Sequence, residues 1–477
     1  MKKIVLIPLM LLPLCLNGCN ERSGNKFKET LIAVFADNQL HNNTPKYTGY
    51  LKNHLNLCKE NGVDVIMIPG DLVNNAMSYQ YTIFEDALKE TYGEDEGDYP
   101  EFVYTMGNHE WYSADEREDE NAVHLFNKHA RIDSNNTVKK TVQTTTTKDA
   151  SIYGNYYKVI NGIPFIGISG ENANGILGYT LRDELTSWLQ DISKLPSVKA
   201  GGPIFMAYHY AFPNVTYSFG QGSTTYSSIL YDLIKDYPQI ILFSGDTHYS
   251  GVNERTINQV DFTDINLGSS SYSRHVSRSV TMKKDEFFEN IQKNSSGKDV
   301  MTGPVAEGYD KTPHIHFVKV DHQGNTTINR YFSTTDSKNP IHLGLEWTIP
   351  AHSNKDNFVY TSNRYENKEW ANTMYGKDGL SWAPDAQLSF QLSAGNLLVS
   401  FPDVSDYHYC EHYRIKVTSI DETTKQFDFI SHYYKYDLSP HENEFMIENN
   451  GFESIKKVEV YAYDFFDNIS INHLENN

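Results

Sequence analysis

Residue types that bind metal ions or carry protons occur at five places between residues 37 and 248 of this chain. Each place follows an apolar run. Carboxylates are hard oxygen donors, imidazoles are nitrogen donors, and the amides of Asn and Gln offer neutral oxygens. Strand ends gather at one edge of an open α/β sheet, so we expect the five groups to converge on one point. The groups are Asp37 with Gln39, Asp71, Asn108 with His109, His209, and Asp246 with His248.

This set of donors is large enough for two adjacent divalent metal sites that share one carboxylate. Two ions about 3.5–4 Å apart can clamp a phosphoryl group and lower the pKa of a bridging water toward about 7. The resulting hydroxide is a nucleophile at neutral pH. His109 directly follows a candidate ligand, so it would lie beside the ions without binding them and could protonate the leaving oxygen. Glu110 is the candidate for orienting the His109 ring.

The apolar runs and the segments between them predict an α/β domain. Strands are expected at residues 30–36, 63–69 and 102–106, with helices at 46–60 and 79–91 between them. This β-α-β-α-β order is typical of a layered α/β domain. The further elements expected are a hairpin at 156–168, helices at 182–195 and 227–235, strands at 204–207 and 240–243, and a closing hairpin at 315–332.

The pattern changes after residue 380. Short alternating runs recur without any helix-length pattern, which predicts an all-β sandwich at 381–477. The last runs resemble the final strands of a fibronectin type III-like domain. Residues 336–380 lack periodicity and are expected to be a linker with irregular packing. The predicted strands of the sandwich are 387–392, 396–401, 413–417, 427–433 and 458–463.

Taken in order, the five groups resemble the motifs of the calcineurin-like metallophosphoesterase superfamily, which includes purple acid phosphatases and bacterial exported phosphoesterases. Gly-Asp-x-x-Asn at 70–74 and Gly-Asn-His-Glu at 107–110 carry the resemblance, which covers about residues 29–335. The resemblance implies a layered β-sandwich core flanked by helices, and hydrolysis of a phosphoric ester by a metal-bridging hydroxide. It also implies a first metal on Asp37, Asp71 and His248, a second on Asp71, Asn108, His209 and Asp246, and His109 as leaving-group acid.

Three positions depart from the pattern of that family. Where this chain has Gln39, Asn74 and Asp246, the family usually has His, Asp and His, respectively. The amide oxygen of Gln39 is a weak ligand, which puts the first metal site in doubt. The oxygen-rich donor set favours Mn²⁺, Fe²⁺, Mg²⁺ or Ca²⁺ over Zn²⁺. A degenerate scaffold that works as a surface ligand- or glycan-binding lipoprotein is therefore the alternative to an enzyme.

Each of these residues also has an ordinary structural explanation. Asp71 after Pro69-Gly70 could be a turn or N-cap residue, and Asn108 could cap a local turn. Five independent turns would have to reproduce the motif order of one family, so the joint pattern favours the metal centre. Substrate-contacting residues are less distinct. Arg274 and His275 in a polar loop could contact phosphate, and Tyr210, Tyr249 and Trp111 could stack on a substrate or pack the rim.

The N-terminus predicts export and lipid anchoring. Lys2 and Lys3 precede an apolar run, residues 4–14, that is too short to span a bilayer. Leu16-Asn17-Gly18-Cys19 resembles a bacterial lipobox, so lipid on Cys19 would hold the protein on a cell-envelope membrane outside the cytoplasm; a plain secretory signal is the alternative. The expected organisation is a signal peptide at 1–18, a tether at 19–28, a catalytic domain at 29–335, a linker at 336–380 and a sandwich at 381–477.

Composition limits the classes of partner. The 61 Asp and Glu outnumber the 41 Lys and Arg, giving a formal net charge of −20. Binding a nucleic-acid backbone requires clustered basic residues, so no nucleic-acid partner is expected. A small phosphorylated substrate held by metal ions is compatible with this charge. The sandwich is the candidate for contact with a cell surface or glycan, and the 477 residues are enough for two folded units.

Overall fold

The computed structural model describes most of the chain beyond residue 26. The predicted signal peptide, Cys19, Arg274 and His275 lie outside the described residues. Among the described residues, none of the helices is both long and apolar enough to cross a membrane. The described residues are 27–112, 122–129, 138–140, 154–212, 224–273, 291–293, 299–301, 313–333, 340–361, 364, 379–433, 442–447, 451–466 and 468–476.

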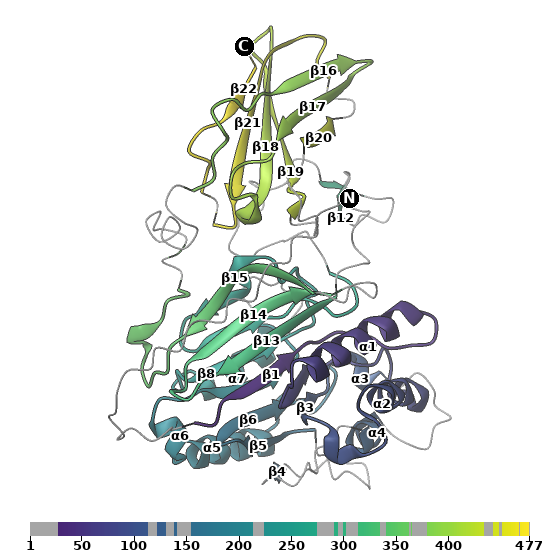
Figure 1. The fold of residues 1–477 in the computed structure, drawn as a ribbon, viewed down its shortest axis with the longest axis vertical. Coiled ribbons are helices and arrows are strands. Elements are labelled where there is room, and N and C mark those ends of the chain that lie inside the picture. Colours follow the sequence, from purple (N-terminus) through teal and green to yellow (C-terminus); the bar gives the residue numbers. More distant parts are fainter. Residues whose placement is uncertain are drawn as a thin grey trace, which may run out of the picture.

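Two large β-sheets form the centre of the N-terminal region, and helices cover their outer faces (Figure 1). The first sheet has six strands in the order β15-β14-β13-β1-β2-β3, with β1, β2 and β3 parallel. Its strands are β1 (Thr30–Val34), β2 (Val65–Pro69), β3 (Glu101–Thr105), β13 (His314–Val320), β14 (Thr326–Phe332) and β15 (Ile341–Ile349).

The second sheet has seven strands in the order β4-β5-β6-β7-β8-β10-β9, and its central strands β6, β7, β8 and β10 are parallel. This fold confirms the predicted layered α/β class. The strands are β4 (Val138–Lys140), β5 (Tyr156–Ile160), β6 (Ile163–Ile168), β7 (Ile204–Tyr208), β8 (Ile240–Ser244), β9 (Ile257–Gln259) and β10 (Thr263–Asn266).

Helix α1 (Pro45–Glu60) follows β1 and covers the first sheet. Proline fits its first turn, where a missing backbone N–H costs nothing. Gly62, just past its end, takes the left-handed φ of 65° that often ends helices. Its buried stripe carries Leu51, Leu55 and Cys58, as their spacing predicts. The other described helices are α2 (Ser78–Tyr92), α3 (Asn108–Trp111), α4 (Ala122–His129), α5 (Tyr179–Ile192), α6 (Pro196–Lys199) and α7 (Thr224–Ile234).

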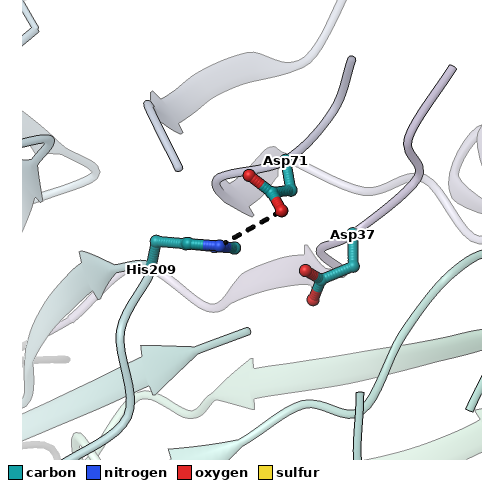
Figure 2. A group of neighbouring side chains, drawn as sticks. All are labelled: Asp37, Asp71 and His209. Carbon is teal, nitrogen blue, oxygen red and sulfur yellow. Dashed lines mark ion pairs between the residues drawn. The ribbon is translucent and has the colours of Figure 1, made fainter. Parts of the chain in front are cut away.

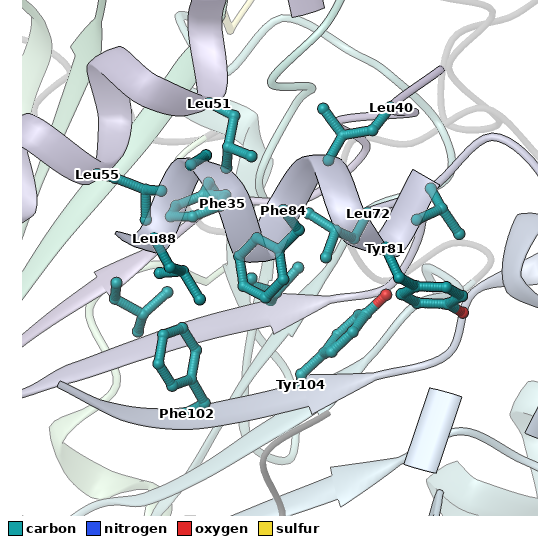
Figure 3. Packing of buried hydrophobic residues seen from close by; sticks show 14 of the residues in the cluster. Phe35, Leu40, Leu51, Leu55, Leu72, Tyr81, Phe84, Leu88, Phe102 and Tyr104 are labelled. Atoms are coloured by element: carbon teal, nitrogen blue, oxygen red, sulfur yellow. The ribbon is translucent and has the colours of Figure 1, made fainter. Parts of the chain in front are cut away.

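Successive side chains of the strands point to opposite faces of the sheet and so contribute to two hydrophobic cores. In β1, Ile32 and Val34 belong to the core between the sheets, whereas Ala33 belongs to the core under the helices. Such burial on both faces explains why the parallel strands are nearly continuous apolar runs. In the core under the helices, Phe84 of α2 packs edge-on against Phe102 of β3 at 6.0 Å (Figure 3).

Strand β15 changes the expected boundary of the first domain. Residues 336–380 were expected to be linker, but β15 (Ile341–Ile349) pairs with β14 and completes the edge of the first sheet. A register shift between Ile328 and Arg330 breaks the ladder, and Gly344 has a φ of 59°. This irregularity removes the simple alternation by which a strand is recognised in a sequence.

The C-terminal region contains two further antiparallel sheets with the orders β16-β17-β20 and β19-β18-β21-β22. One apolar cluster, which includes Val399, Tyr413 and Val460, lies between them. The all-β prediction is therefore confirmed, and likeness to fibronectin type III stays a prediction. The strands are β16 (Ser389–Ser393), β17 (Asn396–Pro402), β18 (Cys410–Ser419), β19 (Thr424–Ile430), β20 (Glu442–Ile447), β21 (Ile455–Asp464) and β22 (Leu474–Glu475), and a separate pair is β11 (Ile291–Lys293) with β12 (Asp299–Met301).

Candidate metal centre

The five predicted groups meet at one edge of the paired sheets. They follow the carboxyl ends of β1, β2 and β3 in the first sheet and of β7 and β8 in the second. The packing of the two sheets thus brings together residues as distant in the sequence as Asp37 and His248. Figure 2 shows side chains from three of these strand ends, Asp37, Asp71 and His209, facing a common space.

Asp71 lies at the centre of the group. One ligand atom from each of Asp37, Asp71 and His209 lies within 4.8 Å of the other two. The Oδ2 atom of Asp71 is 3.3 Å from Nε2 of His209 and 3.8 Å from Nε2 of His109. Its other oxygen accepts a hydrogen bond from the backbone N–H of His109 at 2.9 Å. Asp71 therefore lies close to Asp37 of the predicted first site and to His209 of the predicted second site.

The predicted second site is assembled around His209. Its Nδ1 lies 2.8 Å from the carbonyl oxygen of Pro69, which fixes that nitrogen as the donor and turns Nε2 toward the centre. Nε2 lies 3.1 Å from Oδ1 of Asn108, 3.3 Å from Asp71 and 3.9 Å from Oδ1 of Asp246. Three oxygen donors and one imidazole thus surround one small volume.

The predicted first site is assembled around Asp37. Its Oδ1 lies 3.3 Å from Nε2 of His248 and accepts the backbone N–H of Asp246 at 3.1 Å. Its Oδ2 is buried and has no hydrogen-bond partner among the described residues. The Gln39 amide nitrogen lies 3.3 Å from Nε2 of His248 and 3.4 Å from Nε2 of His109. The structure therefore brings all the predicted site residues together.

The backbone is strained at these residues. Nine non-glycine residues of the described chain have a positive φ, and five of them belong to the site. This conformation costs free energy for side chains other than Gly, and it persists where the surrounding structure enforces it. The five are Asp37 (58°), Gln39 (46°), Asp71 (55°), Asp246 (63°) and His248 (56°).

Two glycines leave the space that the carboxylates need. A Cβ at Gly107 would lie 2.2 Å from Oδ1 of Asp71, and a Cβ at Gly245 would lie 2.5 Å from Oδ2 of Asp37. Both separations are far below van der Waals contact. The glycines of the sequence motifs therefore permit the carboxylates to approach the loop backbone.

Glu110 has a role that differs from the expected one. It was the candidate for orienting His109, but Nδ1 of His109 lies 2.7 Å from the backbone carbonyl of Asn74 instead. The buried Glu110 carboxylate accepts the backbone N–H of Asp71 at 2.8 Å and of Gly107 at 2.7 Å. It also accepts the hydroxyl of Tyr104 at 2.9 Å. Glu110 therefore joins the two loops that carry Asp71 and Asn108. In the sequence, the only indication of a role for Glu110 was its position next to His109.

The charges of the site depend on one another. Burial disfavours ionisation of Asp71, but His209 and His109 more than offset this and lower its pKa. Burial likewise opposes protonation of His209, but Asp71 and the neighbouring carboxylates raise the pKa of that imidazole well above its usual value. Burial raises the pKa of Asp246. The site therefore favours positive charge beside its carboxylates.

The aromatic residues beside the motifs serve packing. Tyr210 and Tyr249 are buried, and the hydroxyl of Tyr210 donates to the carbonyl of Ala173 at 2.7 Å. The indole Nε1 of Trp111 is also buried. By contrast, Tyr112 is exposed with its ring 5.6 Å from the His109 ring, and Tyr272 lies 4.3 Å from the His248 ring. Sequence reasoning missed both as neighbours of the site.

This chain is similar in sequence to a known protein family. The family model described as calcineurin-like phosphoesterase matches residues 30–250. This part of the chain is a calcineurin-like phosphoesterase domain. No curated protein matches the chain. The matched segment includes every predicted ligand and ends two residues after His248.

Three solved structures are similar to this chain at low sequence identity. The anchor protein GAP50 of the Plasmodium inner membrane complex has 15% identity and a TM-score of 0.39, with 69% of this chain and 90% of that chain covered. Purple acid phosphatase PPD1 from yellow lupin (Lupinus luteus) seeds has 11% identity and a TM-score of 0.41, with 69% and 55% covered. A dimetal phosphatase from Danio rerio has 10% identity and a TM-score of 0.35, with 68% and 99% covered.

The residues of this phosphoesterase domain fit divalent cations. Asp37, Asp71 and Asp246 bring three carboxylates together, and Asp37 and Asp71 are almost completely buried. Buried carboxylates are costly unless positive charge accompanies them. The unpartnered Oδ2 of Asp37 and the converging ligand atoms of Asp71 and His209 offer places for such charge.

Proposed function

We propose that this protein hydrolyses a small phosphoric ester, outside the cytoplasm, with divalent metal ions held by the candidate ligands. The observation that carries the proposal is the convergence of Asp37, Asp71 and His209 within 4.8 Å at the ends of strands from two sheets. When bound, such ions act as Lewis acids toward the phosphoryl oxygens and lower the pKa of bound water. The donor set favours Mn²⁺, Fe²⁺, Mg²⁺ or Ca²⁺ over Zn²⁺.

In the proposed reaction, His109 protonates the departing oxygen. Its Nδ1 is held 2.7 Å from the carbonyl of Asn74, so Nε2 is the atom that faces the centre. Its side chain is 26% exposed, unlike those of Asp71 and His209, so a substrate can reach it. In its cationic form the ring also carries a proton at Nε2, and donating that proton to the leaving alkoxide accelerates cleavage of the bond between phosphorus and oxygen.

The other residues hold the reacting groups in place. Asp71 bridges the two halves of the centre, and the Glu110 carboxylate fixes its backbone. His209 is oriented by the carbonyl of Pro69, and His248 by that of Tyr272 at 3.0 Å. Positioning of this kind supplies much of the rate enhancement in phosphoryl transfer.

Turnover of model esters tests the proposal. With added Mn²⁺, the purified chain is expected to hydrolyse an aryl phosphate monoester or diester. The His109→Ala variant is expected to be slower by about 10²–10⁴-fold, the usual contribution of an acid catalyst. His473→Ala, at an exposed histidine of the C-terminal region, is the matched control and should keep full activity. Absence of activity over a panel of esters and metals would remove the proposal.

A second candidate function follows from the altered ligands. Gln39 and Asp246 stand where the family usually has histidine, and the Gln39 amide contacts two imidazoles. In this alternative the domain is a degenerate scaffold, and the C-terminal sandwich binds a glycan or cell-surface ligand. Tightly bound metal together with turnover supports the enzyme. A metal-free, inactive protein that still binds surface glycans supports the scaffold.

We also propose that the protein is exported and anchored by lipid on Cys19. The support is the lipobox-like Leu16-Asn17-Gly18-Cys19 after a short apolar run. Cys19→Ala is expected to move the protein from the membrane fraction to the soluble fraction of a bacterial host. A protein that stays with the membrane after this change would contradict lipid anchoring.

A further inference from the structure

Gln39 occupies a position of the centre where the resembling family usually has His, and its side chain is fixed there. Its backbone N–H donates to the carbonyl of Asp71 at 2.9 Å, and the next residue, Leu40, donates to the carbonyl of Leu72 at 2.9 Å. Gln39 is 5% exposed and has a φ of 46°. The backbone hydrogen bonds from Gln39 and Leu40 to the Asp71 loop therefore hold the Gln39 side chain inside the site.

The Gln39 amide lies between two imidazole nitrogens that point into the centre. Nδ1 of His109 faces the carbonyl of Asn74 at 2.7 Å, and Nδ1 of His248 faces that of Tyr272 at 3.0 Å. A carbonyl oxygen only accepts, so each neutral ring carries its hydrogen on Nδ1 and has an acceptor at Nε2. The two N–H groups of the amide can donate to both Nε2 atoms, at 3.4 and 3.3 Å.

This arrangement competes with a cation at the first site. A cation there must bind Nε2 of His248, so the Gln39 amide has to give up that contact and turn. The ligand that Gln39 could then offer is a neutral oxygen, which binds divalent ions less well than carboxylate or imidazole. Asp37 and Asp71 would be the only charged ligands left beside His248.

Among the described residues, no amide nitrogen is placed against the corresponding imidazole of the second site, where Asn108 presents its oxygen instead. Nε2 of His209 already faces the oxygens of Asn108, Asp71 and Asp246 at 3.1, 3.3 and 3.9 Å. Its Nδ1 is held by Pro69, so Nε2 points at the shared volume before any cation binds. Pre-oriented ligands lose little freedom on binding, which favours affinity.

We propose that the two halves of the centre bind divalent cations unequally. One cation binds tightly at Asp71, Asn108, His209 and Asp246, and a second binds weakly beside Asp37 and His248, because Gln39 supplies an amide where an imidazole ligand is needed. This proposal deepens the proposed hydrolytic function and rests on it. The affinities of the two sites are expected to differ by about 100-fold, the upper end of the effect that residues around a metal site have on its affinity.

The number of Mn²⁺ ions retained after dialysis tests the inequality. Elemental analysis should find about one ion per wild-type chain and about two per chain in Gln39→His, because the variant completes a second imidazole-containing site. Electron paramagnetic resonance should show exchange coupling in Gln39→His alone. Gln39→Ala removes the amide without adding a ligand and should retain about one ion.

Asn74→Asp is the matched control. It changes another position that departs from the family pattern, but Asn74 contacts His109 through its backbone oxygen. It should also retain about one ion, as in the wild type. A wild-type chain retaining two ions or none overturns the proposal. So does a Gln39→His variant with the wild-type circular dichroism spectrum that still retains one, or a Gln39→Ala or Asn74→Asp variant that retains two.

The failures of the two proposals are distinguishable. If the wild type retains two ions and hydrolyses esters, the inequality is wrong and the hydrolytic function stands. If it retains one ion and hydrolyses nothing under any metal, the inequality stands and the hydrolytic function is wrong.

Discussion

At the scale of single residues, the centre depends on hydrogen bonds as well as on ligands. Glu110 binds no metal in the proposed arrangement, yet its carboxylate accepts the backbone N–H groups of Asp71 and Gly107. These donors belong to two different loops. A single buried carboxylate therefore sets the relative position of the loops that carry Asp71 and Asn108.

Removal of this carboxylate should weaken both stability and metal binding. Glu110→Ala leaves buried N–H groups without an acceptor, which is expected to lower the free energy of unfolding by about 2–3 kcal/mol. Mn²⁺ affinity should fall by about 10–100-fold, as for other residues that orient ligands. Urea unfolding and calorimetric titration measure the two effects. The exposed Glu60→Ala should change neither, and an unchanged Mn²⁺ affinity in Glu110→Ala would contradict the assigned role.

Residue types and their order were enough to predict which side chains come together. Asp37, Asp71, Asn108, His209 and His248 meet as expected because each follows a strand, and strand ends converge in this fold. The orienting partners could not be predicted, because they are backbone carbonyls. Their positions depend on loop conformations with positive φ, which residue types alone do not specify.

At the scale of elements, α1 packs against the first sheet around an unusual group of histidines. His54 of α1 and His316 of β13 are fully buried, and neither ring nitrogen of either residue has a hydrogen-bond partner among the described residues. His314 lies on the same face of β13 as His316. Burial, with a contribution from His314, lowers the pKa of His54 to about 3. Burial also lowers the pKa of His314 to about 4 and that of His316 well below its usual value.

These histidines should make folding sensitive to acid. The unfolded chain takes up protons near the ordinary pKa of about 6.5, whereas the folded chain keeps these rings neutral. The free energy of unfolding therefore has its full value, as far as these rings are concerned, above pH 6.5. It declines as the pH falls from 6.5 toward 4, by up to about 1.4 kcal/mol per pH unit for each ring. Urea unfolding across this range measures the slope. His54→Leu should reduce it, whereas His322→Leu, at an exposed ring, should not.

The order of helices and strands could be predicted from the sequence, but β15 and the end of the first sheet could not. The alternation of apolar runs and helical stripes predicts β1 to β3 with α1 and α2 correctly, because both faces of these strands are buried. Strand β15 was missed because a register shift and the positive φ of Gly344 interrupt its pattern. Pairing across a sheet edge is a tertiary property, which periodicity along one segment does not contain.

At the scale of the whole molecule, a buried ion pair joins the C-terminal sandwich to the region of the two large sheets. Arg255 pairs with Glu411 of β18, and the Asn253 side chain donates to the same carboxylate at 3.1 Å. The hydroxyl of Tyr433 accepts the backbone N–H of Gly344 at 2.8 Å. The sandwich is therefore docked through buried polar groups, some of which closely follow His248 in the sequence.

Breaking this pair should loosen the docking. Glu411→Ala leaves Arg255 buried without its carboxylate, which is expected to cost about 3 kcal/mol of stability. Urea unfolding and limited proteolysis between the two parts measure the loss. Lys456→Ala removes an exposed ion pair with Glu422 and should cost less than about 1 kcal/mol. Equal effects of the two changes would show that the buried pair does not hold the sandwich.

Anomalous diffraction at the manganese edge, from crystals grown with Mn²⁺, tests the central claim most directly. The proposed centre predicts a strong peak between Asp71 and Nε2 of His209, at about 2–2.6 Å from the ligand atoms. A weaker peak or none is predicted beside Asp37 and His248. A map without a peak next to Asp71, or with manganese bound only elsewhere, would contradict the account.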